Sequence, residues 1–385
     1  MNKLSLATSI FKTMETDASM ALFMRDTGGC LVPKLAVSRS VDEAREITFA
    51  ELAESAIFYF SIAPIAILNS KIFSKVFKNS SKEIAQNIKT LDKQAIDKVR
   101  NIKLAKVGRI GASFSILLPL IYAIAPIRNL ITLKKTGKEE FIKVVNLKKS
   151  NNKPKSKGLN RSEKIKAEEK ARQNSIKLLK KLGAITITGL TVTAGFISLA
   201  KNPTIFKKAE PFINGLIKKL DFNGNNATLK QFGYLIMPVS VGSYLAASRD
   251  KYEVLENIQR FAITIPMMFF GQDAIEKRIY KFFDKKFGSN LTTGNSIKTY
   301  KEIFAETTNQ TKNLKSKNWS IALAFLINTS LMAAAVGLLN RVATKKRYIR
   351  SQKELFANKP FENQVLKWQN CFHQKQYRRQ LSQIT

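Results

Sequence analysis

Histidine is almost absent from this chain, which has a single one, His373, near the end of the sequence. A serine hydrolase needs an imidazole base, and HExxH zinc sites and most haem sites need histidine ligands. His373 lies in a polar, basic stretch, where a lone histidine is ordinarily solvated. We therefore predict no histidine-based catalysis, identify no catalytic residue, and expect no metal site and no cofactor.

Cysteine is nearly as scarce, since the chain has two, Cys30 and Cys371. Two such distant cysteines form neither a disulfide framework nor a complete zinc ligand set. The sequence also shows no acid-rich cluster that would hold Mg²⁺ for prenyl or phosphatidyl transfer. The N-terminal stretch has no long apolar run and no small-residue cleavage site, so we predict no cleaved signal peptide. These absences argue against an enzyme, although a membrane enzyme that uses Lys, Arg or Glu stays open.

Acidic residues are few as well, because 28 Asp and Glu face 65 Lys and Arg, for a net charge of +37. One reading is a coding bias towards Lys, Ile and Asn, and the other is attraction to anionic lipid or nucleic acid. The basic stretches contain neither a known nucleic-acid module nor interleaved aromatic residues for base stacking. We therefore expect the lipid bilayer and its anionic head groups, and not nucleic acid, as partners. The oligomeric state is not readable.

Long uncharged runs are what the chain has instead. Asn318–Asn340 carries no charge between Lys317 and Arg341, and a helix of this length crosses the ~30 Å hydrocarbon layer. Further runs of this kind lie at 110–127, 182–200 and 231–248. The sequence thus predicts a mainly α-helical, polytopic integral membrane protein with about four full spans.

Two shorter uncharged runs, 55–70 and 261–272, centre on Pro64 and Pro266. Each is short for a span, and proline removes a backbone donor. We expect two short, Pro-centred membrane segments that are kinked, re-entrant or interfacial.

The spans and the basic connectors divide the chain into five regions. These are a first membrane module (1–135), a basic flexible loop (136–181), a linking transmembrane helix (182–200), a second membrane module (201–346) and a basic cytoplasmic tail (347–385). The loop prediction rests on KKSNNKPKSKGLNRSEK, which has no apolar pattern. Basic residues flank both ends of several spans, so the positive-inside rule leaves the topology open. We expect the loop and the tail to share the cytoplasmic side of a bacterial-type membrane.

The two modules contain short matches in the same order, which is typical of an internal duplication. Leu35–Arg39 (LAVSR) resembles Leu245–Arg249 (LAASR), and Glu54 and Pro64 align with Glu256 and Pro266. Membrane segments also match by chance, because they share composition. Duplication and chance therefore both stay open.

Charged residues near membrane depth are the candidate functional residues, because burying them is unfavourable. Glu54, Glu256 and Arg260 lie at the mouths of the Pro-centred segments, and the last two are spaced to pair on one helix. Asn328 falls near the middle of its span and either bonds to a neighbouring helix or lines a polar path. The alternative for the charged residues is that they mark the water boundary.

Two basic helices that also carry phenylalanine are candidates for binding lipid head groups. Their basic residues are Lys71, Lys75, Lys78, Lys277, Arg278 and Lys281. Each basic residue at an anionic surface contributes about 1 kcal/mol. Alternatively, the apolar faces of these helices pack against the protein itself.

The sequence favours a non-enzymatic membrane protein that moves a small solute or lipid through a duplicated helical module. The alternative is a membrane-associated scaffold that binds anionic lipid through its basic amphipathic helices.

Overall fold

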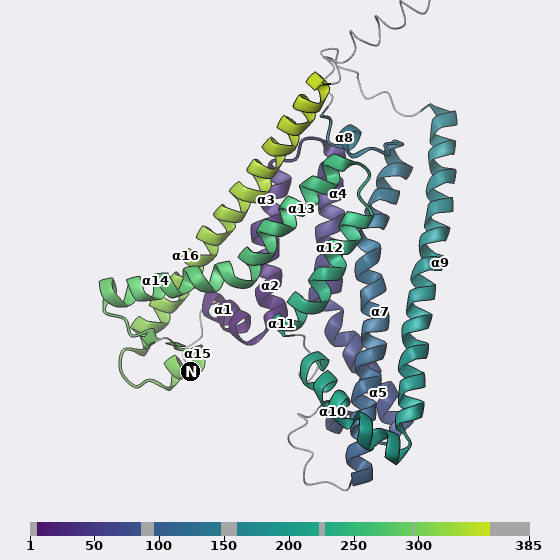
Figure 1. Ribbon diagram of the computed structural model, residues 1–385. Helices are drawn as coiled ribbons and strands as arrows, with labels where there is room; N and C mark the ends of the chain where they lie inside the picture. The colour runs from purple at the N-terminus through teal and green to yellow at the C-terminus, as the bar shows by residue number, and fades with distance from the viewer. Residues whose placement is uncertain (1–5, 86–95, 148–159, 223–227, 295, 355–385) are drawn as a thin grey trace, which may run out of the picture.

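The computed structural model describes residues 6–85, 96–147, 160–222, 228–294 and 296–354, and these are mainly helical (Figure 1). Within those ranges three helices are long and apolar enough to cross a membrane. They are α7 (Ile96–Thr136), α9 (Arg161–Ala200) and the helix Gln310–Glu354, which contains α16 (Gln310–Met332) and the π-helical η6 (Ala333–Leu339). The expected helical class with membrane-length helices is confirmed, and the run 318–340 lies inside the third of them.

A fourth candidate span is a bent pair of helices, Val41–Phe60 and Ile62–Phe77, whose axes differ by 42°. It consists of α4 (Val41–Glu54), the π-helical η2 (Ser55–Phe60) and α5 (Ile62–Phe77). The break at Ser61 follows from Pro64, whose ring clashes with the carbonyl four residues earlier, on Phe60. The short segment predicted at 55–70 is therefore the middle of a much longer bent helix.

The helices α7 and α9 are antiparallel neighbours (Figure 1). Gly111 of α7 faces Thr193 of α9, and Gly189 of α9 faces Ser115 of α7, with no room for a Cβ at either glycine. Small residues let the two backbones approach closely, as they do at helix interfaces in membranes.

The start of α9 contradicts the flexible loop predicted for 136–181. Its residues 161–181 are helical and continue without a break into the apolar run 182–200. Asn160 and Glu163 form a reciprocal capping box, which satisfies backbone donors at the helix start. This signal outweighs the polar composition of the stretch, while residues 148–159 lie outside the described residues.

The apolar part of α9 is exposed rather than buried, since 6% of its span window is covered by the protein. Ile187 and Val192 expose 65% and 66% of their surface. A membrane around α9 would bury the apolar side chains that the described residues leave exposed.

Two other predicted segments need correction. The run 231–248 forms the short α11 (Leu229–Gln231), the π-helical η4 (Phe232–Ile236) and α12 (Met237–Ala246). Its apolar helix, Phe232–Ala246, is too short for a full span. The run 261–272 lies within a continuous helical path through α13 (Lys251–Pro266), η5 (Met267–Gly271) and α14 (Gln272–Phe287), so it is no isolated short segment.

The remaining elements are short or lie at the ends of the long helices. They are α1 (Leu6–Thr16), α2 (Ala18–Asp26), η1 (Thr27–Leu31), α3 (Val32–Ala36), α6 (Ser81–Ala85), α8 (Phe141–Val144), α10 (Pro203–Leu220), β1 (Thr292–Thr293), β2 (Ser296–Ile297) and α15 (Tyr300–Ala305). The strands pair antiparallel, with Thr292 opposite Ile297.

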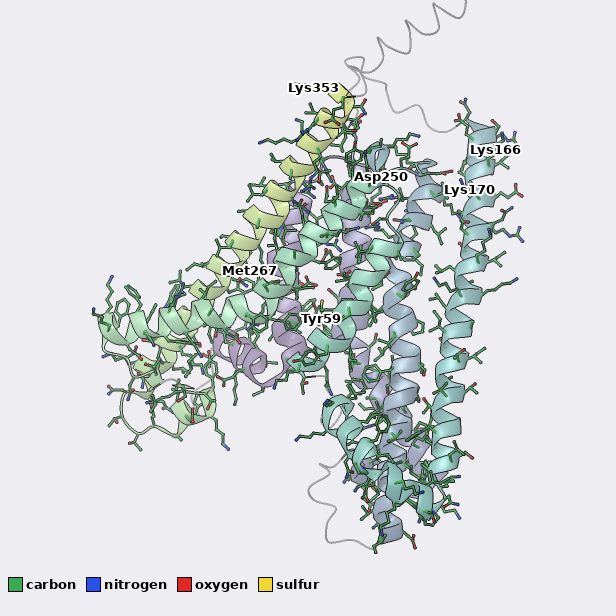
Figure 2. The ribbon with its side chains drawn as sticks, in the orientation of Figure 1. Tyr59, Lys166, Lys170, Asp250, Met267 and Lys353 are labelled. Atoms are coloured by element: carbon green, nitrogen blue, oxygen red, sulfur yellow. The ribbon has the colours of Figure 1, made fainter. Side chains whose placement is uncertain are left out.

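The first helix set, α2 to α7, interlocks with the second helix set, α11 to α16. From the second set, α12 packs on α7, while from the first set η1 packs on α16 and α3 on η6. The main apolar core, which includes Phe58, Tyr59, Phe232, Tyr244 and Met268, lies between the sets. In Figure 2 Asp250, Lys353 and Lys166 lie near one end of the molecule, whereas Tyr59 lies deep in the bundle. We call the end of the molecule where Asp250, Lys353 and Lys166 lie the Lys353 end.

Candidate functional site

Two helices begin near the Lys353 end with closely similar caps. Ser40 caps α4 by accepting a hydrogen bond from the Glu43 N–H, and Asp250 caps α13 by accepting from the Tyr252 and Glu253 N–H groups. An arginine precedes each cap, and its guanidinium bonds the glutamate four residues later: Arg39 to Glu43, and Arg249 to Glu253. The sequence thus places one arginine–carboxylate pair at each helix start.

These pairs also connect the two helix sets reciprocally. Arg39 Nη2 lies 2.8 Å from Glu256 Oε1 of α13, and Arg249 Nη1 lies 2.7 Å from Glu46 Oε1 of α4. Two further arginines reach across in the same way. Arg128 of α7 binds Glu253 at 2.5 Å, and Arg341 of the α16 helix binds Glu43 at 3.3 Å.

We call these residues the charged layer: Arg39, Glu43, Glu46, Arg128, Arg249, Glu253, Glu256 and Arg341. It contains equal numbers of arginines and glutamates. Glu43, Glu46 and Glu253 are 5%, 6% and 2% exposed, so most of the attraction acts away from water. Such groups stay ionised only while they are paired, and removing one partner leaves a buried charge uncompensated.

The pKa values of Glu253 and Arg249 reflect this pairing. Burial raises the pKa of Glu253, but Arg128 and Arg249 outweigh burial and hold it below its ordinary value. Burial lowers the pKa of Arg249, yet Glu253 and Glu46 raise it above that of a free arginine. The partners of Glu253 and Arg249 thus favour the ionised form of each of these two groups.

A second group of charges lies deeper, one to three turns further along α4. Three carboxylates, Asp26, Glu51 and Glu54, come within 4.8 Å of one another, and all three are buried. The Lys34 ammonium binds Glu51 in a short contact, and the Tyr59 hydroxyl donates to Asp26 at 3.2 Å. We call Asp26, Glu51 and Glu54 the carboxylate cluster; the sequence did not reveal it, because α2 and α4 are separate in the chain.

Two further side chains complete the surroundings of Glu54. The Arg260 guanidinium stacks over the Tyr244 ring at 4.2 Å and attracts the Glu54 carboxylate. The Tyr244 hydroxyl lies beside Glu54 without completing a hydrogen bond, and Glu54 Oε1 has no hydrogen-bond partner.

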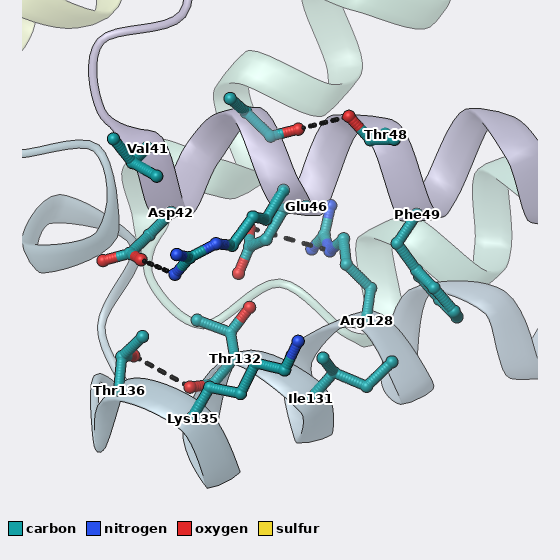
Figure 3. Close-up of a pocket in the computed structure, with 12 residues that line it drawn as sticks. Val41, Asp42, Glu46, Thr48, Phe49, Arg128, Ile131, Thr132, Lys135 and Thr136 are labelled. Carbon is teal, nitrogen blue, oxygen red and sulfur yellow. Dashed lines mark hydrogen bonds and ion pairs between the residues drawn. The ribbon is translucent and has the colours of Figure 1, made fainter.

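Two hollows meet at the charged layer. An inner cavity of about 70 Å³ is lined by both charge groups, including Lys34, Glu51, Arg260 and Glu253, and has room for a few water molecules. An outer cleft of about 440 Å³ lies between α4 and α7 (Figure 3). Glu46 and Arg128 line both hollows and face each other, 3.9 Å apart. The outer cleft and the inner cavity therefore share these two residues in their linings.

Three of the four predicted membrane-depth residues meet in this region. Glu54 belongs to the carboxylate cluster, Glu256 to the charged layer, and Arg260 faces Glu54. The predicted pairing of Glu256 with Arg260 is wrong: Glu256 binds Arg39, and among the described residues no ion pair joins the two. Burial against the other helix set redirected both side chains.

Asn328 lies apart from this region. It is 2% exposed, its Oδ1 has no hydrogen-bond partner, and it faces Gly271 of η5. The predicted hydrogen bond from Asn328 to a neighbouring helix is therefore not made by its carbonyl oxygen.

The six predicted head-group residues are all exposed at the surface. On α5, however, the phenylalanines do not face outward with them: Phe77 is buried, and Phe73 packs over Gly108 of α7. The exposed apolar residues between the lysines are Ile72 and Val76, at 47% and 60%.

Reasoning from the sequence missed most of the charged layer, although a signal was present. After each copy of Leu-Ala-x-Ser-Arg, glutamates follow the arginine by four and by seven residues: Glu43 and Glu46, then Glu253 and Glu256. When the two arginines are aligned, Glu256 corresponds to Glu46. The ion pairs therefore favour this alignment over the predicted one, which matched Glu256 with Glu54.

Comparison of the chain with protein-family models, with curated proteins and with solved structures finds no match. The description of the protein therefore rests on its own fold and site. It is a mainly helical chain with three or four helices that could span a membrane, and it buries two groups of charges between its helix sets.

Proposed function

We propose that the protein is a non-enzymatic integral membrane protein that moves a small polar solute between its two helix sets. The charged layer would close this passage near the Lys353 end. The proposal includes an internal duplication, in which α4 and α13 are equivalent helices and α7 corresponds to the α16 helix.

The observation that carries the proposal is that each arginine of the charged layer binds a glutamate of the other helix set, besides the pairs formed within a set. Arg39 and Arg128 of the first set bind Glu256 and Glu253 of α13, and Arg249 and Arg341 of the second set bind Glu46 and Glu43 of α4. A layer that only stabilised each set would form its contacts within that set. Ion pairs between two repeated modules can break and re-form as one module moves against the other.

The lining of the interior favours a polar solute over a lipid. The inner cavity is bounded by ionic side chains on several helices, and a lipid tail would leave them without partners. Beyond the layer lies the carboxylate cluster, and below that the apolar core that includes Phe58 and Met268. The apolar core would close the passage on the side away from the Lys353 end.

Cys30 offers a native reporter for this passage. Its side chain is 1% exposed and lies beside Asp26, behind the charged layer. In a Cys371→Ser background, a membrane-impermeant thiol reagent should label Cys30 slowly. Arg249→Ala should speed labelling from the Lys353 end, by about tenfold for each 1.4 kcal/mol by which it shifts the equilibrium towards an open state.

The matched control is Arg350→Ala, which removes an arginine from an exposed pair with Glu354. It should leave the labelling rate of Cys30 unchanged. Equal rates in both variants would contradict a gate. Acceleration from both membrane faces would mean that Arg249→Ala has unfolded the bundle, which would also contradict it.

A second candidate function, anchoring to anionic lipid, is favoured by Ile72 and Val76. They are exposed between Lys71, Lys75 and Lys78, and the described residues leave them uncovered. Replacing the three lysines by glutamine should weaken binding of the purified protein to phosphatidylserine-containing nanodiscs relative to phosphatidylcholine ones. Binding that does not respond to these changes would eliminate α5 as an anchor.

A further inference from the structure

The carboxylate cluster and the cations that face it do not carry equal and opposite charge. Its three carboxylates, Asp26, Glu51 and Glu54, face two permanent cations, Lys34 and Arg260. If every group is ionised, one negative charge remains in a region shielded from water. An uncompensated buried charge is unfavourable by several kcal/mol, so a bound positive charge is needed there.

The hydrogen bonds show where that charge is missing. Glu51 is paired with Lys34, and Asp26 accepts from the Tyr59 hydroxyl. Glu54, by contrast, has an oxygen atom, Oε1, that is buried and accepts no hydrogen bond. A buried carboxylate oxygen without a donor is unfavourable.

A second group points to the same place independently of the cluster. Tyr244 comes from α12, is 1% exposed, and holds its hydroxyl beside Glu54 with no hydrogen-bond partner. Glu54 and Tyr244 therefore both lack a partner at one spot. In the described part of the chain, the other titratable or charged groups that act on this spot include Asp26, Cys30, Lys34, Glu51, Tyr59, Arg128 and Arg260.

We propose that the carboxylate cluster binds one proton, that Glu54 carries it, and that its uptake and release are coupled to passage of the solute. One added proton neutralises Glu54 and leaves Asp26 and Glu51 balanced by Lys34 and Arg260. The protonated carboxyl then gains a hydroxyl that can bond to Tyr244. The inner cavity, lined by Glu51, Lys34 and Arg260, gives water a place from which the proton can come. The coupling rests on the proposed transport function, but the proton site does not.

Infrared difference spectroscopy on the purified full-length protein, exchanged between H₂O and D₂O, tests the site directly. A buried, protonated carboxylic acid gives a carbonyl band that shifts on deuteration. We expect wild type at neutral pH to show such a band, and Glu54→Gln to lose it. The matched control is Glu139→Gln, which removes an exposed glutamate and should leave the band intact.

Two variants that leave Glu54 in place test the charge balance. Asp26→Asn removes one negative charge, so Glu54 should ionise and the band should disappear. Lys34→Gln removes one positive charge, so a second carboxyl should be protonated and the band should grow to about twice its intensity. If Asp26 and Lys34 had a merely structural role, the carbonyl band would be unchanged in both variants.

The outcomes separate the ideas. Absence of the band in wild type, or its persistence in either Glu54→Gln or Asp26→Asn, would overturn the proton site. A band that Na⁺ abolishes at fixed pH would make the cluster a site for a metal cation, which also overturns it. If the carbonyl bands behave as expected but Arg249→Ala does not change the labelling rate of Cys30, the proposed gate is refuted and the proton site is retained.

Discussion

Removing Arg249 should destabilise the protein far more than removing an arginine at the surface. Arg249 binds Glu46 at 2.7 Å and Glu253 at 3.0 Å, and all three side chains are less than 10% exposed. Breaking a buried pair by deleting one partner is destabilising by roughly 3–5 kcal/mol. Arg128 still contacts both glutamates after the change, so we expect a value near the lower end, about 3 kcal/mol.

Equilibrium unfolding in mixed micelles, with SDS as the denaturant and circular dichroism as the signal, measures this difference. Arg350→Ala is the reference, because its pair with Glu354 has side chains that are 85% and 64% exposed. Exposed helix pairs contribute about 0.3–0.5 kcal/mol. The expected gap corresponds to roughly a hundredfold change in the unfolding equilibrium constant.

The double variant Arg249→Ala/Glu46→Gln distinguishes pairing from packing. If the two side chains interact, the double variant should be less destabilised than the sum of the single variants, by about 1–2 kcal/mol. Strict additivity would show that Arg249 acts through volume alone. If Arg249→Ala proved no worse than Arg350→Ala, the reasoning about the charged layer would be refuted.

Three other perturbations have defined outcomes. In α9, Gly189→Ala should destabilise by about 1–3 kcal/mol, because Ser115 occupies the space, whereas Gly183→Ala in open space should stabilise by about 0.5–1 kcal/mol in the same unfolding assay. Burial raises the pKa of Asp284, but the hydrogen bonds donated by the following loop outweigh burial, so that the pKa lies below its ordinary value. Its contribution to stability is thus present above the ordinary value of 3.8 and lost as pH falls through the lowered value; Asp284→Asn should flatten the acid limb of thermal stability against pH. Finally, Lys353→Cys and Thr204→Cys should react with an impermeant maleimide from opposite membrane faces, and labelling of both from one face would exclude the arrangement of α9 as a span.

The parts of the fold that were predictable are those set by local composition. Asn318–Asn340 and 110–127 fall inside long helices, because an uncharged run of that length has no better structure in lipid. The boundaries were less predictable. The start of α9 depends on one capping box at Asn160, and the length of the bent pair depends on η2 joining α4 to Ser61.

The site was predictable only in part, for a different reason. Glu54, Glu256 and Arg260 stood out because each charge borders an apolar run, which is a local property. Their partners did not, since Arg39 and Glu256 lie on different helix sets and meet only when the sets interlock. The carboxylate cluster likewise needs α2 and α4 side by side, and hydropathy carries no information on that contact.

The inner face of α4 connects the two charge groups. Glu43, Glu46, Glu51 and Glu54 recur at intervals that keep them on one side of a helix, and all four are buried. An ordinary helix at this position would place apolar residues there, and replacing buried ion pairs by apolar side chains of similar volume is often neutral or even stabilising. Stability alone therefore does not explain an acidic stripe that runs from the charged layer to the carboxylate cluster. Under the proposed function the stripe places charges at successive depths along the passage, and Glu43, Glu46 and Glu54 there face arginines of the opposite helix set.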